Sequence, residues 1–247
     1  MNNKKNLPIC FYPWFKILIA YTGEAYSCCW NTQPMGNVYK DNLMDIWNGE
    51  KYQKFRNILA GGDLTGAPCE ECVYRLCHSA QRYPYLPPGP NGKNILFNFK
   101  QAQDDFSCGK ASLSAKPDIL RMDFSYECDI RCKMCYQDHD NIKTRFPREF
   151  IERFFAEKYY NYASSVVLVG GEPLLIPESV EIIQRLAKIG PGECQLVLST
   201  NGLLLDKFWD CLKAFRKALF CISLDSCVPK TYESIRRGAK WEHIVSK

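Results

Sequence analysis

The stretch Cys128-Asp-Ile-Arg-Cys132-Lys-Met-Cys135-Tyr136 places three cysteines at the spacing C-x3-C-x2-C. It closely follows an apolar run at residues 119–124 that predicts a β-strand. A loop of this kind can bring three thiolates together, and soft thiolates bind zinc, copper(I) or iron–sulfur clusters. Three thiolates leave one iron of a four-iron cluster open to another ligand. The alternative is a zinc site with His139 as fourth ligand, because Cys135-x3-His139 is also zinc spacing.

From residue 117 onward, the sequence alternates between strand and helix patterns. The predicted strands are residues 119–124, 165–169, 195–199 and 219–223, and the predicted helices are residues 148–159, 178–188, 205–217 and 230–237. This alternation predicts an α/β fold with a parallel sheet, whose sites lie in loops beyond the carboxyl ends of the strands. Only four βα units are present, so the last strand is expected to be an edge.

Each strand after the first ends in a polar or glycine-rich motif. The second is followed by Gly170-Gly171-Glu172-Pro173, the third by Ser199-Thr-Asn201-Gly and the fourth by Ser223-Leu-Asp225. Glycines let a backbone approach a ligand closely, and Glu172 is a candidate acceptor for a cationic amine. Arg236, predicted on the next helix, is a candidate donor to a carboxylate. Ordinary turns, helix caps and a solvated arginine are the alternative interpretations.

The N-terminal third carries a second set of cysteines. Two β-prone runs at residues 15–21 and 25–30, joined around Gly23, predict a hairpin with Cys28 on its second strand. A helix is predicted at residues 50–60. Four candidate thiolates surround these elements, and zinc or an iron–sulfur cluster would suit them equally: Cys10, Cys28, Cys69 and Cys72. We therefore predict a small cysteine-rich domain at residues 1–82, a linker at 83–116 and the α/β domain at 117–247.

Composition limits the possible functions further. The chain has 247 residues, 46% of them hydrophobic, and a net charge of +5 without a block of basic residues, so charge gives no indication of nucleic-acid binding. Its 14 cysteines fit either disulfides in an exported protein or metal ligands in a reducing compartment. Pro8, Pro13 and Lys16 interrupt the N-terminal apolar stretch, which argues against a signal peptide. We expect a cytoplasmic protein without membrane spans.

The motifs C-x3-C-x2-C and G-G-E-P together resemble those of radical S-adenosylmethionine (SAM) enzymes. The resemblance implies that Cys128, Cys132 and Cys135 bind a [4Fe–4S] cluster whose fourth iron takes the amine and carboxylate of SAM. It assigns the SAM ammonium group to Gly170, Gly171, Glu172 and Pro173. The remaining SAM contacts that it implies are Ser199 and Asn201 for ribose and carboxylate, Ser223 and Asp225 for ribose or substrate, Arg236 for carboxylate, and Tyr136 for adenine.

The N-terminal cysteines resemble the SPASM and twitch auxiliary-cluster domains, on the order C-x12-G-x4-C and then C-x2-C. The resemblance implies an auxiliary [4Fe–4S] cluster on Cys10, Cys28, Cys69 and Cys72. Cys77 arrives one residue early and Gln81 stands where a further cysteine is usual, so a single-cluster, twitch-like domain is expected. Cys29 is an alternative to Cys28, and Cys108 is an unassigned candidate. The domain precedes the radical SAM region, whereas the better-known order is the reverse.

The resemblance implies an enzyme that cleaves SAM reductively to a 5′-deoxyadenosyl radical, which abstracts hydrogen from a substrate. The expected substrate is a peptide, a protein or a small molecule, and the expected electron donor is a protein such as flavodoxin or ferredoxin. The resemblance assigns no catalytic side chain. The fold expected is a partial (β/α) barrel, cut short because the family uses six units. The alternatives are a non-catalytic iron–sulfur or zinc module, or an inactive fragment of a longer radical SAM protein.

Overall fold

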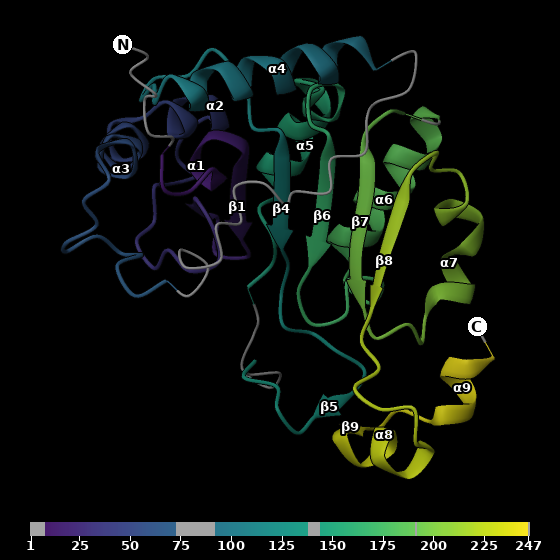
Figure 1. Ribbon diagram of the computed structural model, residues 1–247. Coiled ribbons are helices and arrows are strands. Elements are labelled where there is room, and N and C mark those ends of the chain that lie inside the picture. The colour runs from purple at the N-terminus through teal and green to yellow at the C-terminus, as the bar shows by residue number, and fades with distance from the viewer. Residues whose placement is uncertain (1–7, 73–91, 138–143, 191, 247) are drawn as a thin grey trace.

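The computed structural model describes residues 8–72, 92–137, 144–190 and 192–246. Its centre is a seven-stranded sheet with the order β3-β2-β1-β4-β6-β7-β8 (Figure 1). The strands are β1 (Lys16–Ala20), β2 (Glu24–Tyr26), β3 (Gly36–Asn37), β4 (Ile119–Asp123), β6 (Ser165–Val169), β7 (Gln195–Thr200) and β8 (Ala218–Ile222).

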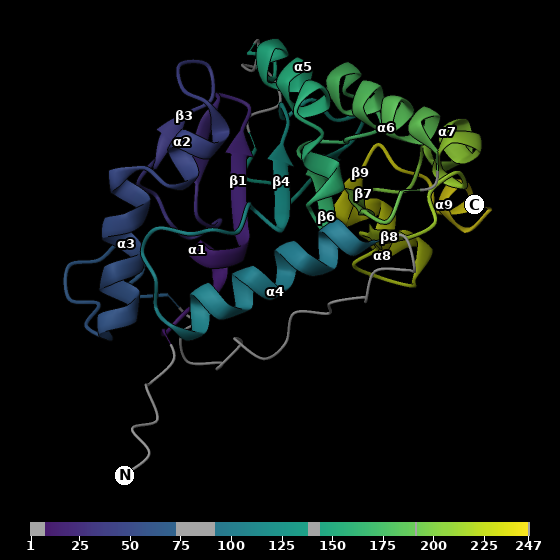
Figure 2. The same cartoon turned by 90° about the horizontal axis from the view of Figure 1, so that it is seen from above.

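The C-terminal half of the sheet is parallel, as the strand–helix alternation predicted. β4 pairs with β6, β6 with β7, and β7 with β8, all in parallel. Three helices cover one face, as Figure 2 shows: α5 (Arg148–Ala156), α6 (Pro177–Ile189) and α7 (Leu205–Leu212). Leu120, Val166 and Leu196 are buried on this face because the helices seal it from water. The predicted partial barrel is confirmed, and β8 is an edge strand among the described residues.

The cysteine-rich N-terminal unit belongs to the same sheet. β1 lies parallel beside β4, with Lys16 opposite Ile119 and Ala20 opposite Asp123. The apolar run at residues 17–19 is buried on both faces, which requires sheet neighbours on either side. The predicted hairpin with β2 supplies one neighbour and β4 supplies the other. The sequence did not predict that the two units share a sheet; the domain boundary at residue 82 stays a prediction.

Helix α4 (Lys93–Ser107) lies within the segment at residues 83–116 that was predicted as a linker, and the division into domains stays a prediction. The helix was missed because Asn98 and Asp105 stand on its buried face and interrupt the apolar periodicity. Asn98 bonds the backbone of Lys116, and Asp105 accepts from the amide of Ser114 at 2.9 Å. These polar contacts fasten α4 to the segment that leads into β4. Residues 83–91 lie outside the described residues.

Arg56 anchors the N-terminal helices to the rest of the chain. These are α1 (Tyr12–Phe15), α2 (Leu43–Trp47) and α3 (Glu50–Gly61). The fully buried guanidinium of Arg56 lies 4.5 Å from the ring centroid of Trp47 and 4.7 Å from that of Tyr52. It donates to the carbonyl oxygens of Pro13 and Ala111, each at 2.8 Å. Helix α3 also confirms the helix predicted at residues 50–60.

A second, two-stranded sheet lies beyond the carboxyl ends of the parallel strands (Figure 1). It pairs β5 (Arg131–Cys132) with β9 (Arg236–Arg237). In the chain, β9 follows α8 (Pro229–Ile235) and precedes α9 (Trp241–Val245). The helix predicted at residues 230–237 thus ends early, and Arg236 lies on a strand instead. The structure also contains the 3₁₀ turn η3 (Tyr159–Asn161). Among the described helices, none combines the length and apolar character that crossing a membrane requires.

Candidate functional site

The three cysteines of the opening motif lie in the loop after β4, at the carboxyl end of the sheet. Cys128, Cys132 and Cys135 are half-buried and carry free thiols. Burial raises the pKa of Cys128 to about 11, and the negative charge of Cys132 adds to the rise. Burial also raises the pKa of Cys132, where Cys135 contributes and Arg236 opposes. The thiols therefore lie within electrostatic reach of one another.

A single metal ion is the alternative to a cluster at these three cysteines. Within the described ranges, no group of three His, Cys, Asp or Glu side chains is close enough to hold one ion. The convergence of the three thiolates on one group therefore stays a prediction, and His139 lies outside the described residues. A four-iron cluster takes each thiolate on a different iron, so its ligands are spread around a larger group. Three thiolates from one loop are a donor set that fits such a cluster with one iron left open.

The Gly170-Gly171 turn packs on the backbone that precedes the cysteines. The amide of Gly171 donates to the carbonyl of Ser125 at 3.0 Å, and that of Glu172 donates to Glu127 at 2.8 Å. A Cβ at Gly171 would lie 2.0 Å from the carbonyl oxygen of Glu127. Real Cβ atoms do not approach that closely, so this position requires glycine. The sequence analysis expected the small size of these glycines to admit a ligand. In the structure, the small size of Gly171 lets the loop after β6 pack against the backbone that leads into the cysteine loop.

Glu172 connects the loop after β6 to the loop after β7. Its side chain is fully buried and accepts hydrogen bonds from the Thr200 hydroxyl at 2.8 Å and the Asn201 amide at 2.7 Å. The amide of Leu174 donates to the same carboxylate at 3.1 Å. Burial raises the pKa of Glu172, while these hydrogen bonds oppose the rise. This bridging role was not predicted, and the expected contact with the SAM amine stays a prediction.

Asn201 carries the connection on to the cysteine loop. Its side-chain nitrogen donates to a carboxylate oxygen of Asp129 at 2.7 Å and lies 4.0 Å from the sulfur of Cys128. Ser199, two residues earlier, is half-buried within β7. The loop after β7 therefore contacts Cys128 through the side-chain amide of Asn201.

Arg236, on strand β9, makes a second contact with the cysteine loop. Its guanidinium donates to the sulfur of Cys132 at 3.6 Å and pairs with Asp225 at 2.7 Å. Asp225 has φ +62°, a left-handed conformation that few non-glycine residues adopt. The amide of Ser223 donates to the carbonyl of Thr200 at 3.1 Å. The expected contact of Arg236 with the SAM carboxylate stays a prediction.

Gln137 is a site residue that the sequence did not single out. Its side-chain amide donates to the carbonyl of Gly170 at 3.1 Å, which ties the end of the cysteine loop to the G-G-E-P turn. No spacing or residue type marks it in the sequence. Tyr136 beside it is 87% exposed, and Pro173 is buried. The adenine contact expected of Tyr136 stays a prediction.

The four N-terminal cysteines come together around one narrow cavity. Cys10, Cys28, Cys69 and Cys72 line a space of about 40 Å³ with apolar neighbours such as Leu59. Burial raises the pKa of Cys10 to about 12, and the other three thiols add to it. Cys28 follows β2 rather than lying on it as predicted.

Two further cysteines can be compared with this set. Cys29 is exposed and does not line the cavity, so the arrangement favours Cys28 as the ligand. Cys108 is exposed at the end of α4. Cys77 lies outside the described residues.

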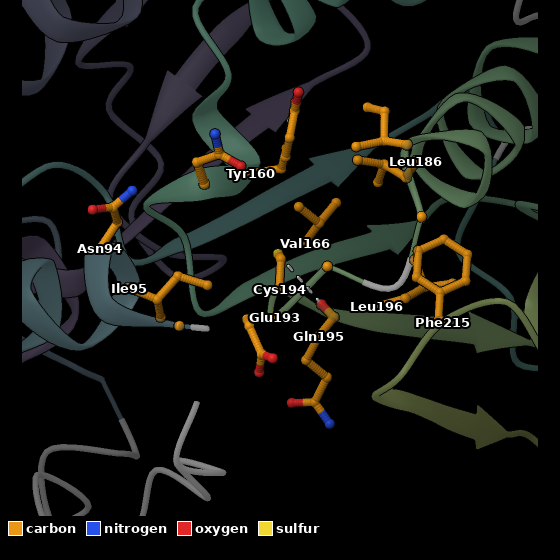
Figure 3. A pocket seen from close by; sticks show the side chains of 15 residues that line it. Asn94, Ile95, Tyr160, Val166, Leu186, Glu193, Cys194, Gln195, Leu196 and Phe215 are labelled. Carbon is orange, nitrogen blue, oxygen red and sulfur yellow. Dashed lines mark hydrogen bonds between the residues drawn. The ribbon is translucent and has the colours of Figure 1, made fainter. Parts of the chain in front are cut away.

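A cavity of about 320 Å³ lies at the opposite end of the sheet, around the start of β7 (Figure 3). Its lining comes from several elements and includes Ile95, Val166, Cys194 and Phe215. None of the predicted site residues lines it. Since parallel sheets carry their sites at the carboxyl ends of the strands, we place the candidate site at the cysteine loop.

Family comparisons agree with this location. A model described as the radical SAM superfamily matches residues 122–246, just over half of the chain. A second model, described as SPASM, an iron–sulfur cluster-binding domain, matches residues 10–73. The second match precedes the first, in the order that the sequence motifs indicated. Both regions contain the cysteines described above.

Curated relatives align with about half of the chain. GTP 3′,8-cyclase of Alkaliphilus metalliredigens is 32% identical over 133 residues, and that of Microcystis aeruginosa is 31% identical over 137 residues. Each alignment covers 51% of this chain and 40% of the relative, so the chain spans well under half of these proteins. Streptococcus suis SuiB bound to S-adenosylmethionine aligns at 15% identity with a TM-score of 0.42, covering 93% of this chain and 51% of that one.

Proposed function

Because this chain belongs to the radical SAM superfamily, we propose that it is, or is part of, an enzyme that cleaves SAM reductively to start radical chemistry. The superfamily match implies a [4Fe–4S] cluster and SAM, and the SPASM match implies an auxiliary iron–sulfur cluster. The observation that carries the proposal is that two distant segments, the loop after β7 and strand β9, both contact the cysteine loop. Asn201 reaches Cys128, and Arg236 reaches Cys132.

The residues present fit the implied cluster. Cys128, Cys132 and Cys135 supply three thiolates from one short loop, and three thiolates leave one iron for the amine and carboxylate of SAM. When bound and reduced, the cluster supplies the electron that breaks the S–C5′ bond of SAM and gives the 5′-deoxyadenosyl radical. The protein's own part is to hold the thiolates and SAM in position and to exclude water.

The rim residues perform that positioning. Glu172 fixes the loop after β7 against the loop after β6. Asn201 contacts Asp129 and Arg236 contacts Cys132, and both contacts orient the cysteine loop. Backbone groups of Gly170, Gly171 and Pro173 are proposed to face the SAM ammonium group. The proposed contacts with the rest of SAM are Ser199, Ser223, Asp225 and Tyr136.

The N-terminal cavity is proposed to hold the auxiliary [4Fe–4S] cluster on Cys10, Cys28, Cys69 and Cys72. Four thiolates leave no iron open, which suits an electron relay better than a catalytic centre. Electrons would come from a small carrier such as ferredoxin or flavodoxin.

We propose a peptide or protein as the substrate. The support is the resemblance of residues 10–73 to SPASM domains. The curated relatives are named for a reaction of GTP, so a nucleotide is the alternative substrate. Their alignments cover about half of this chain and leave most of each relative unmatched, so the substrate does not carry over with the family.

Anaerobic reconstitution with iron and sulfide tests the proposal. We expect about eight irons per chain, as two [4Fe–4S] clusters, and 5′-deoxyadenosine after addition of SAM and dithionite. Cys132→Ala should retain about half of the iron and form no 5′-deoxyadenosine. Iron without product would instead indicate a non-catalytic iron–sulfur module, and a colourless protein containing zinc would refute the cluster assignment.

A further inference from the structure

The face of the sheet opposite α5, α6 and α7 carries a group of charged residues. Figure 2 shows these helices on one side of the strands, with β1 next to β4. Strand alternation places Lys16, Arg121 and Asp123 together on the opposite face, where they are half-buried. Val167 and Val169 continue this face on β6. Half-buried charges on a sheet face require partners.

Arg121 and Asp123 form a two-pronged ion pair. The Nε of Arg121 lies 2.6 Å from one carboxylate oxygen of Asp123, and a terminal nitrogen lies 2.9 Å from the other. Both side chains are about a quarter exposed, at 24% and 25%. The pair therefore uses both oxygens of Asp123, and its two charges cancel.

Lys16 adds a positive charge that has no matching carboxylate. Its ammonium lies 4.9 Å from the ring centroid of Tyr12, and no ion pair joins it to a carboxylate in the described part of the chain. Burial lowers the pKa of Lys16, and the charge of Arg121 lowers it further, whereas the thiols of Cys29 and Cys28 and the more distant carboxylate of Asp123 oppose this. The group as a whole carries a surplus of one positive charge.

This group lies between the two sets of cysteines. Tyr12, beneath the ammonium of Lys16, lines the cavity of Cys10 and Cys28. At the other end, Arg121 lies on β4, the strand that leads into the loop of Cys128, Cys132 and Cys135. A ligand held by Lys16 and Arg121 would therefore lie between the auxiliary cysteines and the SAM site.

We propose that Lys16 and Arg121 form a subsite for one carboxylate of the substrate, such as an acidic side chain or the C-terminus of a peptide; this rests on the proposed function. A carboxylate carries a single negative charge and matches the single surplus charge of the group. A phosphate ester carries more charge than the group can neutralise. The ammonium of Lys16 and the terminal nitrogen of Arg121 that does not bond Asp123 supply the donors.

Cys29 is an exposed thiol within electrostatic reach of both cations and can report on the subsite. The reconstituted protein is treated anaerobically with anionic iodoacetate or with neutral iodoacetamide, and alkylation is quantified at each cysteine by peptide mass spectrometry. The ratio of the two rates at Cys29 is compared with that at Cys221, an exposed thiol on the same sheet face at β8. We expect a several-fold higher ratio at Cys29, and Lys16→Met should abolish the difference. Equal ratios in the unmodified sequence would overturn the surplus charge.

Protection of Cys29 from iodoacetamide then identifies the anion. N-acetylglutamate amide should slow alkylation of Cys29 several-fold, whereas N-acetylglutamine amide and inorganic phosphate should not. Stronger protection by phosphate would overturn the carboxylate assignment, and protection by neither anion would show that Lys16 serves only the neighbouring thiols. The assay contains no SAM and no reductant, so its outcome is independent of SAM cleavage, which the 5′-deoxyadenosine measurement decides separately.

Discussion

The guanidinium of Arg236 lies 3.6 Å from the sulfur of Cys132, although 104 residues separate them in the chain. The contact arises because β9 pairs with β5 and places the two residues opposite each other. Asp225 holds the same guanidinium at 2.7 Å. A cationic donor on a thiolate stabilises the more negative, reduced state of a cluster bound there, since hydrogen bonds to the sulfurs help to set its potential.

Arg236→Met is therefore expected to lower the reduction potential of the cluster on the cysteine loop by tens of millivolts. Potentiometric titration followed by electron paramagnetic resonance measures this directly. Arg237→Met removes the neighbouring exposed charge and is the matched control. An unchanged potential in the Arg236 variant, with iron content preserved, would show that the contact has no influence on the cluster.

Gly171→Ala tests the close packing of the loop after β6 on the cysteine loop. The new Cβ would meet the carbonyl oxygen of Glu127 at 2.0 Å, so we expect a loss of about 1–3 kcal/mol in unfolding free energy and loss of iron from the cysteine loop. Gly61→Ala, where no atom lies within 4 Å of the new Cβ, is the control and should not destabilise. Urea unfolding and iron analysis provide the two readouts. Equal stability of the two variants would contradict the assigned packing.

The sequence motifs predicted which loops form this site better than they predicted the hydrogen bonds between those loops. The strand–helix alternation was enough to bring residues 128–136, 170–173 and 199–201 to one end of the sheet, because parallel strands place their loops there. The bonds among them are tertiary and leave no local signal. Nothing in the sequence says that Glu172 turns inward to Thr200, or that Gln137 bonds Gly170.

Cys28→Ala and Cys29→Ala separate the two candidates for the fourth auxiliary ligand. Cys28 lines the cavity shared with Cys10, whereas Cys29 is exposed outside it. We expect Cys28→Ala to lose about half of the reconstituted iron, equivalent to one of two clusters. Cys29→Ala should keep all of it. The opposite pattern in iron and sulfide analysis would reassign the ligand.

Asp118 gives the chain a predictable pH dependence. Burial raises its pKa to about 7, even though the hydroxyl of Ser164 donates to it at 2.6 Å. The nearby Cys194 thiol, whose pKa burial raises to about 12, stays neutral in this range. In the unfolded chain the carboxyl titrates near 3.9. Between these values the folded chain holds a proton that the unfolded chain has lost, so stability falls as pH rises from about 4 to about 7.

Asp118→Asn should remove this loss, because an amide stays neutral throughout. Urea unfolding at pH 5 and pH 7 should show the unmodified chain losing about 1.4 kcal/mol per pH unit relative to the variant. Asp104→Asn, at an exposed position, is the control and should follow the unmodified chain. A parallel pH profile for the Asp118 variant would mean that this carboxyl is already ionised in the folded protein.

Two features of the fold could not be obtained from local patterns. The pairing of β1 with β4 joins segments a hundred residues apart, and an apolar strand such as residues 17–19 does not indicate which neighbour it will take. Arg236 follows a helical pattern without a break, and only its partner strand β5 moves it out of the helix. In both cases, the decisive contact is between residues far apart in the sequence.

The central claim is that Cys128, Cys132 and Cys135 hold a cluster with one iron open to SAM. Electron paramagnetic resonance of the reduced, reconstituted Cys28→Ala variant, with the auxiliary cluster removed, isolates this cluster. Adding SAM should change its spectrum, and the additional substitution Cys132→Ala should abolish the signal. A spectrum that SAM leaves unchanged, or one that survives the loss of Cys132, would contradict the account.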